Sequence, residues 1–181
     1  NTLAKEVEKH LAQVNKVKDL SASARTAAKR AIAALRRGEN ERAQKLVAEA
    51  LSALKTLAPI LAREPRFLSE GYYREAVEEF AEALLLQAYL LGEDIVFPSY
   101  VYIEPEEILS GAADVSGELV RRAVSLTRES GALQEIRRYK KTIENLAHDM
   151  AGAAHSGKLR QKHDEVERNL AKIERILYEM N

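Results

Sequence analysis

Residues 75–91 read EAVEEFAEALLLQAYLL, the most informative stretch of the chain. It contains no Gly or Pro and has the pattern of a helix. On a helix with about 100° per residue, Glu75, Glu79 and Glu82 fall on one face within roughly 60° of one another. Like charges at this spacing repel by about 0.2–0.5 kcal/mol per pair, and no Lys stands among them. The stretch therefore predicts a helix that gathers carboxylates for a purpose other than folding.

A second acidic pair, Asp114 and Glu118, stands further along the chain in another apolar helical pattern. It lies among small residues that include Gly111 and Gly117. Each glycine lowers helix stability by about 1 kcal/mol relative to Ala, so we expect another helix to approach closely there. Two helices that each present carboxylates can share one divalent cation. The two stretches together predict a metal-dependent catalytic site.

The residue types indicate which cation this site would hold. Carboxylates in a chain without cysteine, and with no histidine at an obvious partner spacing, suit Mg²⁺ or Mn²⁺ better than Zn²⁺. A di-iron centre is disfavoured because the chain has no Glu-x-x-His motif. Glu118 is either a ligand or the ion-pair partner of Arg121 or Arg122. The other acids near these stretches have simpler interpretations as solvated or helix-capping groups: Glu75, Glu78, Glu106 and Glu107.

The charge of the chain is unevenly distributed, although its formal net value is zero. Residues 1–66 carry a net charge of +7, residues 67–118 carry −11, and residues 119–181 carry +4. An acidic centre between basic flanks suggests cation binding together with a polyanionic partner. The longest apolar runs are too short to span a membrane, and no signal peptide or cysteine is present. We therefore expect a cytoplasmic protein with no membrane association.

Basic residues crowd the second half of the first predicted helix. One interpretation is a solvated helix face, and the other is a face that contacts phosphate groups, since few acids stand nearby. The candidates for contact with the phosphates of a nucleic acid on this helix are Arg25, Lys29, Arg30, Arg36 and Arg37.

Hydrophobic periodicity predicts an all-α chain, residues 1–181, with one domain and one core, folded as a six- to seven-helix antiparallel bundle. Gly38 suits the end of the first helix, Pro59 should kink or shorten the second, and Ser69 is expected to cap the third. Residues 92–103 are predicted to form an ordered loop. The expected helices span residues 2–37, 40–62, 69–91, 105–128, 133–154 and 158–179.

Three segments of the sequence resemble the translin family. They are residues 79–83 (EFAEA), residues 108–119 (ILSGAADVSGEL) and residues 169–174 (NLAKIE). Within that family the chain resembles the catalytic type represented by translin-associated factor X, because the acids at Glu79, Glu82 and Asp114 are all present. The short loop at 92–103 resembles that of an archaeal member.

This resemblance implies a Mg²⁺-dependent endoribonuclease that cuts small or structured RNA, single-stranded or duplex. Glu79, Glu82 and Asp114 would bind the metal, for which Mn²⁺ should substitute. An acid matching Glu118 occurs in both types of the family, which implies a structural or supporting role there. Lys29 and Arg30 match a basic pair that would face RNA, and the assembly would be a homo-oligomer, with a closed octamer as the specific hypothesis.

Two other functions stay open at this point. The first alternative is a non-catalytic nucleic-acid-binding helical oligomer of the translin type, which would bind RNA in a salt-sensitive way without cutting it. The second is a scaffold whose basic flanks bind the acidic surface of another chain.

Overall fold

Long amphipathic helices with few interruptions account for nearly all of the fold. The computed structural model describes residues 2–153 and 157–180, and within these ranges it contains six α-helices, one short 3₁₀ helix and no β-strand. The predictions of an all-α fold and of six to seven helices are therefore confirmed. The elements along the chain are α1 (Thr2–Arg36), α2 (Asn40–Arg63), η1 (Pro65–Ser69), α3 (Gly71–Leu91), α4 (Pro105–Leu126), α5 (Leu133–Ala151) and α6 (Gly157–Glu179).

The chain divides into two units, Asn1–Glu107 and Ile108–Asn181. The prediction that residues 1–181 form a single domain stays a prediction. In the first unit α1 packs along both α2 and α3, and α3 contributes Tyr73, Phe80 and Leu86 to the core. The largest fully buried side chains of this unit are Leu35, Leu54, Leu57, Leu61, Phe67, Tyr73, Phe80 and Leu86.

The turn between α1 and α2 follows from the glycine at position 38. Gly38 has a φ of +74°, a left-handed conformation that glycine adopts readily. The backbone N–H groups of Gly38 and Glu39 donate to the carbonyls of Leu35 and Ala34, each at 3.0 Å. These bonds satisfy carbonyls that the helix end would otherwise leave open, so the predicted C-terminal role of Gly38 is confirmed.

One prediction about the helix ends of this unit is wrong, and another is tested only in part. Helix α2 continues past Pro59 to Arg63, with Leu57 and Leu61 on either side of the proline both buried. Pro59 therefore does not shorten the helix, and a kink at this position stays a prediction. Ser69 does not cap α3. Its hydroxyl instead donates to the carbonyl of Arg66 at 2.8 Å inside η1, and α3 begins two residues later, at Gly71.

The connection from α3 to α4 is an ordered loop, as predicted, and it is fastened to the first unit by side chains of α3. The hydroxyl of Tyr73, which is 2% exposed, donates to the carbonyl of Tyr102 at 2.8 Å. Burial raises the pKa of this tyrosine well above its ordinary value. Within the loop the N–H of Val101 donates to the carbonyl of Pro98 at 2.9 Å.

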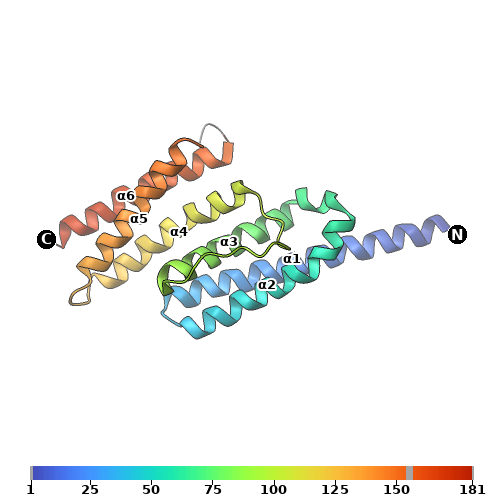
Figure 1. The fold of residues 1–181 in the computed structure, drawn as a ribbon, viewed down its shortest axis with the longest axis horizontal. Coiled ribbons are helices and arrows are strands. Elements are labelled where there is room, and N and C mark those ends of the chain that lie inside the picture. Colours follow the sequence, from blue (N-terminus) through green and yellow to red (C-terminus); the bar gives the residue numbers. More distant parts are fainter. Residues whose placement is uncertain (1, 154–156, 181) are drawn as a thin grey trace. The chain divides into compact units, whose positions relative to one another are not determined.

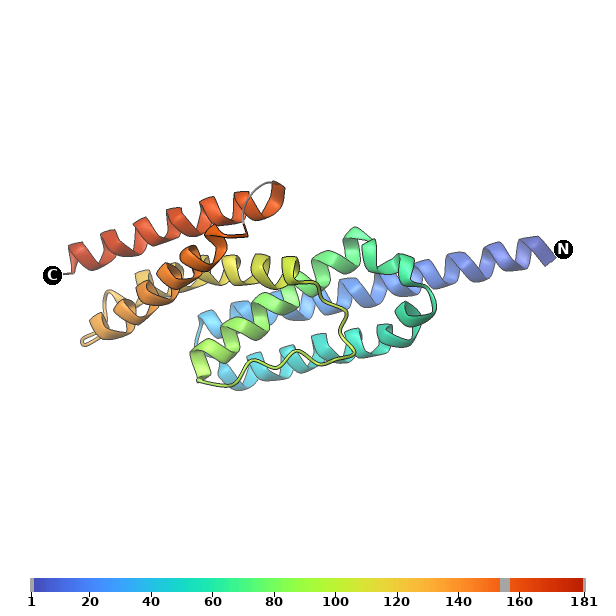
Figure 2. The ribbon, with the colours of Figure 1, turned by 45° about the horizontal axis from the view of Figure 1, so that its top comes forward.

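The second unit consists of most of α4 together with α5 and α6. Helices α5 and α6 pack against each other, as Figure 2 shows for the orange and red ribbons. Tyr139 of α5 is fully buried, and its hydroxyl accepts a hydrogen bond from Arg122 of α4 at 2.8 Å and donates one to Glu135. Helix α4 ends two residues earlier than predicted, and α5 ends at Ala151, three residues earlier; residue 154, the predicted end, lies outside the described residues.

Candidate metal and RNA site

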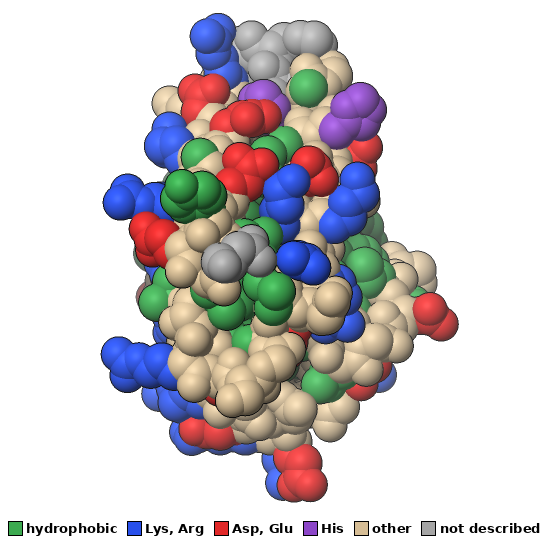
Figure 3. Space-filling view, turned by 90° about the vertical axis from the view of Figure 1, so that its left-hand side faces the viewer, with side chains coloured by type: hydrophobic (Ala, Val, Ile, Leu, Met, Phe, Trp, Pro, Cys, Tyr) green, Lys and Arg blue, Asp and Glu red, His purple; other side chains and the backbone are tan. Residues whose placement is uncertain are grey.

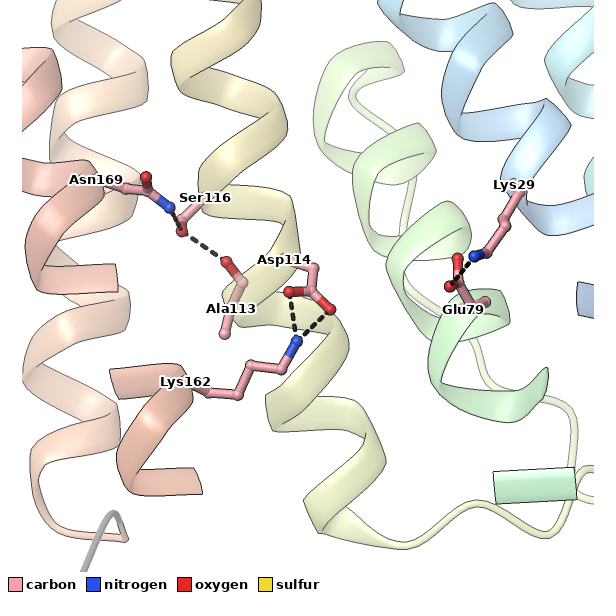
Figure 4. A network of polar contacts seen from close by, with 7 residues as sticks. All are labelled: Lys29, Glu79, Ala113, Asp114, Ser116, Lys162 and Asn169. Carbon is pink, nitrogen blue, oxygen red and sulfur yellow. Dashed lines mark hydrogen bonds and ion pairs between the residues drawn. The ribbon is translucent and has the colours of Figure 1, made fainter. Parts of the chain in front are cut away.

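Glu79 and Glu82 lie on α3, where the sequence predicted two of the metal ligands. The side chain of Glu79 is 22% exposed and forms an ion pair with Lys29 of α1, whose Nζ lies 3.1 Å from Oε1 of Glu79 (Figure 4). One turn earlier Arg25 pairs with Glu75 at 2.7 Å. Helices α1 and α3 run in the same direction, as the first and third helices of an up-down-up unit do. Two residues that are four apart on α1 therefore face two residues that are four apart on α3. The repulsion along α3 is therefore relieved by cations from α1, not by a Lys on the same helix.

These pairs also change the interpretation of the basic residues on α1. Arg25 and Lys29 bind α3 carboxylates, and Arg37 pairs with Glu39 at 2.6 Å. The Arg37–Glu39 hydrogen bond raises the pKa of Arg37 and lowers the pKa of Glu39. Arg30 and Arg36 are exposed, and Arg30 borders a shallow cavity of about 330 Å³ together with Asp19 and Glu49. Three of the five candidates thus have a structural role in addition to any contact with RNA.

Asp114, the third predicted ligand, lies on α4 and is held by a residue that sequence reasoning missed. Lys162 of α6 donates to both carboxylate oxygens of Asp114, at 2.5 and 2.6 Å (Figure 4). The side chains are 17% and 26% exposed, respectively, so the pair is partly shielded from water. Lys162 stands 48 residues after Asp114, in a helix with many exposed charges, and nothing in the sequence distinguishes it from them.

Glu118, for which two roles were open, forms an ion pair with Arg121 one turn later on α4. The carboxylate is 7% exposed and the guanidinium 62% exposed. This confirms the ion-pair interpretation with Arg121, while a part in metal binding stays a prediction.

The small-residue segment of α4 contacts an amide of α6, Asn169, which the sequence analysis named only as part of residues 169–174. Asn169, 4% exposed, donates from Nδ2 to the hydroxyl of Ser116 at 2.9 Å, and Ser116 donates to the carbonyl of Ala113 at 2.6 Å. The backbone of Gly117 faces the same amide. The expected close approach of a helix to Gly117 is therefore made by α6, and it fixes the turn of α4 that carries Asp114.

Glu107 is a second residue whose role was not predicted from the sequence. It was assigned to a solvated first turn, but it is 3% exposed. Its carboxylate pairs with Arg74 of α3 and accepts the backbone N–H of Glu104 at 2.8 Å. It lines a cavity of about 400 Å³ bounded by η1, α3 and the loop before α4. Its role is to join α3 to the start of α4.

The proposed metal ligands are divided between the two units, with Glu79 and Glu82 in the first and Asp114 and Glu118 in the second. Within either unit, the described residues contain no group of three or more His, Cys, Asp and Glu side chains able to hold a metal ion. The convergence of Glu79, Glu82 and Asp114 on one cation accordingly stays a prediction.

The chemistry of the donors fits a hard divalent cation. All three are carboxylates, and at Glu79 and Asp114 the existing partner is an ammonium group, which is the normal partner of an ionised carboxylate. Oxygen ligands with full negative charge are those that Mg²⁺ and Mn²⁺ prefer.

The chain is thus an all-helical protein within the described residues, with candidate acids in α3 and α4 and a basic α1. The sequence profile of the translin family matches residues 5–181 of the chain. The chain therefore belongs to the translin family.

Comparisons with other proteins are consistent with this assignment. The chain is 36% identical over 103 residues to an uncharacterised protein of Methanocaldococcus jannaschii, an alignment that covers 55% of this chain and 42% of that protein. The fold is similar to the crystal structure of apo-NeC3PO, with a TM-score of 0.86, 23% identity, and coverage of 99% of this chain and 96% of the other. It is similar also to AfC3PO solved in complex with duplex RNA, with a TM-score of 0.84, 20% identity, and coverage of 99% and 94%. These similarities confirm the translin-type fold.

One further property bears on the prediction about membranes. Among the described residues, no helix has the length and apolar character that crossing a membrane requires.

Proposed function

We propose that this chain is a Mg²⁺-dependent endoribonuclease that acts on small or structured RNA, single-stranded or duplex. Glu79, Glu82 and Asp114 serve as the metal ligands. The observation that carries the proposal is the presence of partly buried, ionised carboxylates at Glu79 and Asp114, each on a long helix that packing holds in place. Membership of the translin family and a similar fold solved with duplex RNA support it.

In this proposal, one set of residues binds the metal ion and another contacts the RNA. A Mg²⁺ ion bound there would activate water and stabilise the charge that develops on the scissile phosphate. Glu79, Glu82 and Asp114 hold and orient the ion, and Arg30 and Arg36 on the exposed side of α1 contact the RNA backbone. Mn²⁺ is expected to replace Mg²⁺ because it accepts the same oxygen ligands.

The test is cleavage of a labelled RNA duplex by the full chain with Mg²⁺, and then with EDTA. We expect cleavage to stop with EDTA and to fall by about 10²-fold or more in Glu79→Gln and in Asp114→Asn, since each removes a ligand charge. Glu75→Gln is the matched control, because Glu75 has the same residue type, lies on the same helix face and makes the same kind of ion pair to α1. Cleavage by Asp114→Asn at the wild-type rate would show that the site assignment is wrong.

A second candidate, a nucleic-acid-binding oligomer without chemistry, is favoured by one observation. Lys29 and Lys162 already neutralise two of the proposed ligands, so the folded chain satisfies these acids without a metal. This candidate predicts RNA binding that weakens steeply with salt and no cleavage with any divalent cation. The same cleavage assay, run beside a filter-binding assay at several salt concentrations, separates the two functions.

We also propose that the chain assembles into a homo-oligomer, with a closed octamer as the specific form. Supporting this, α1 carries an exposed apolar stripe of Leu3, Val7 and Leu11, which are 68%, 50% and 54% exposed. In addition, Val124, Ile176 and Met180 line an open cavity of about 510 Å³ at the C-terminal end of the second unit. Figure 3 shows hydrophobic side chains at the surface of this end, with charged groups around them. Apolar surfaces of this kind commonly mark contacts between chains.

A further inference from the structure

Two of the proposed metal ligands share an unexpected feature, which is a lysine bonded directly to the carboxylate. Lys162 covers both oxygens of Asp114, and Lys29 bonds to one oxygen of Glu79. Each pair joins two different helices within one unit, α4 with α6 and α1 with α3. Neither lysine lies next to its acid in the sequence, so the pairing is a product of the fold.

An ammonium and a divalent cation compete for the same carboxylate oxygens. With Nζ at 2.5 and 2.6 Å from the two oxygens of Asp114, Lys162 occupies the bidentate position between them. A cation could bind both oxygens of Asp114 together only after this ammonium has moved, and at the remaining lone pairs the two positive charges would repel each other at close range. Lysine is suited to such an exchange, since its compact ammonium sits on a flexible four-carbon stem.

We propose that Lys162 and Lys29 are built-in counter-ions of the metal site, which hold Asp114 and Glu79 in the metal-free chain and release them when a divalent cation binds. This inference rests on the proposed function and adds a form of regulation to it. The lysines keep the acids neutralised while the site is empty, and so lower its affinity for free cations. Once released, the ammonium groups remain within one side-chain length of the carboxylates, where an RNA phosphate is their natural partner.

Cation and RNA binding should therefore support each other. If the RNA phosphate receives the released ammonium, RNA removes the competitor of the cation, and by linkage the cation must raise the affinity for RNA by the same factor. The site would then load its cation chiefly when the substrate is present.

The experiment measures Mn²⁺ binding to the full chain by calorimetry and by electron paramagnetic resonance, at fixed ionic strength and without RNA. We expect Lys162→Gln to bind Mn²⁺ about three- to fivefold more tightly than the wild type, as expected for the loss of a partly exposed ion pair. Lys162→Arg, which retains the positive charge, should stay within about twofold of the wild type. Lys172→Gln is the matched control on α6, because Lys172 contacts the amide of Asn169 and not a carboxylate.

A second measurement keeps the test independent of how well each variant folds. Unfolding by urea, with and without saturating Mn²⁺, gives the stabilisation that the cation adds to each variant. Lys162→Gln should be less stable than the wild type without Mn²⁺ but should gain more from it. Addition of a duplex RNA with 2′-O-methyl groups, which resists cleavage, should tighten Mn²⁺ binding in the wild type and have a smaller effect in Lys162→Gln.

The outcomes separate this inference from the proposed function. Mn²⁺ binding that is lost in Asp114→Asn but has equal affinity in the wild type and Lys162→Gln would overturn the counter-ion role and leave the metal site in place. Absence of Mn²⁺ binding in every variant, with and without the RNA, would overturn both.

Discussion

Glu107 shows how one carboxylate can hold a chain reversal together. It is almost completely buried, its oxygens bind Arg74 and the backbone of Glu104, and it stands where the loop after α3 turns into α4. Removing one member of a buried ion pair is costly because the other charge and the backbone donor lose their partner.

We therefore predict that Glu107→Ala lowers the free energy of unfolding by about 2–3 kcal/mol. The matched control is its neighbour Glu106, which is 48% exposed and lies 3.6 Å from the same Arg74. For Glu106→Ala we expect a loss below about 1 kcal/mol. Urea unfolding of the full chain, followed by circular dichroism, measures both values, and similar losses in the two variants would contradict the role given to Glu107.

The same residue shows where sequence reasoning loses information. Two adjacent glutamates in the first turn of a helix have one explanation from sequence, the helix dipole, and it applies equally to Glu106 and Glu107. Only the folded structure distinguishes them, because Arg74 and the backbone N–H of Glu104 enclose Glu107, whereas Glu106 meets Arg74 alone and stays half exposed. Lys162 was missed for a related reason, since its partner Asp114 is distant along the chain.

Helix α4 combines small residues with a precise contact to α6. Asn169 bonds to Ser116 and lies over Gly117, where an added Cβ would be 3.5 Å from the amide nitrogen, an ordinary contact distance. The approach that the sequence predicted is thus close enough to exclude a large side chain, yet it leaves room for a methyl group.

This geometry predicts that two substitutions of Gly117 change the free energy of unfolding in opposite directions. Gly117→Ala should raise the free energy of unfolding by about 0.5–1 kcal/mol, because Ala is the better helix former and meets no steric conflict. Gly117→Val should lower it by about 1–3 kcal/mol, because its branched side chain would push into Asn169. Thermal and urea unfolding of both variants test this, and destabilisation by Ala would mean that α4 and α6 lie closer together than described.

The helices themselves were largely predictable from sequence, because an apolar period of 3.6 residues over twenty or more residues has few alternatives. The residues at which the helices begin and end were less predictable. Pro59 does not shorten α2, which continues for four residues beyond it, and α3 starts without the side-chain cap expected from Ser69. The candidate acids were found because they violate the folding pattern, whereas their lysine partners conform to the pattern of a solvated helix and gave no signal.

At the scale of the molecule, the apolar stripe on α1 is the strongest indication of self-association. Figure 1 shows the N-terminal part of α1 extending past the end of α2 within the first unit. The stripe of Leu3, Val7 and Leu11 lies on this extension and contributes nothing to the core of its own unit. A substitution there should consequently affect assembly without affecting the fold.

We predict that the double substitution Val7→Lys with Leu11→Lys reduces the assembly to smaller species, while the far-ultraviolet circular dichroism per residue stays near that of the wild type. Ala12→Lys, an exposed position on the other side of the same helix, is the control for added charge. Size-exclusion chromatography with light scattering measures the mass of each. A wild-type chain that elutes as a plain monomer would refute the proposed homo-oligomer.

The overhang of α1 also has a consequence for protection against hydrogen exchange. A helix of 35 residues is roughly 52 Å long and one of 24 residues roughly 36 Å, so the first turns of α1 extend past α2. His10 bonds to Arg66 of η1 at 2.8 Å, and the turns before His10 are exposed. Isolated turns of this kind open at little free-energy cost. Backbone amides near Leu3 and Val7 should exchange with deuterium quickly in a separated chain and slowly in an assembled one, which makes this end of the protein a local reporter of association.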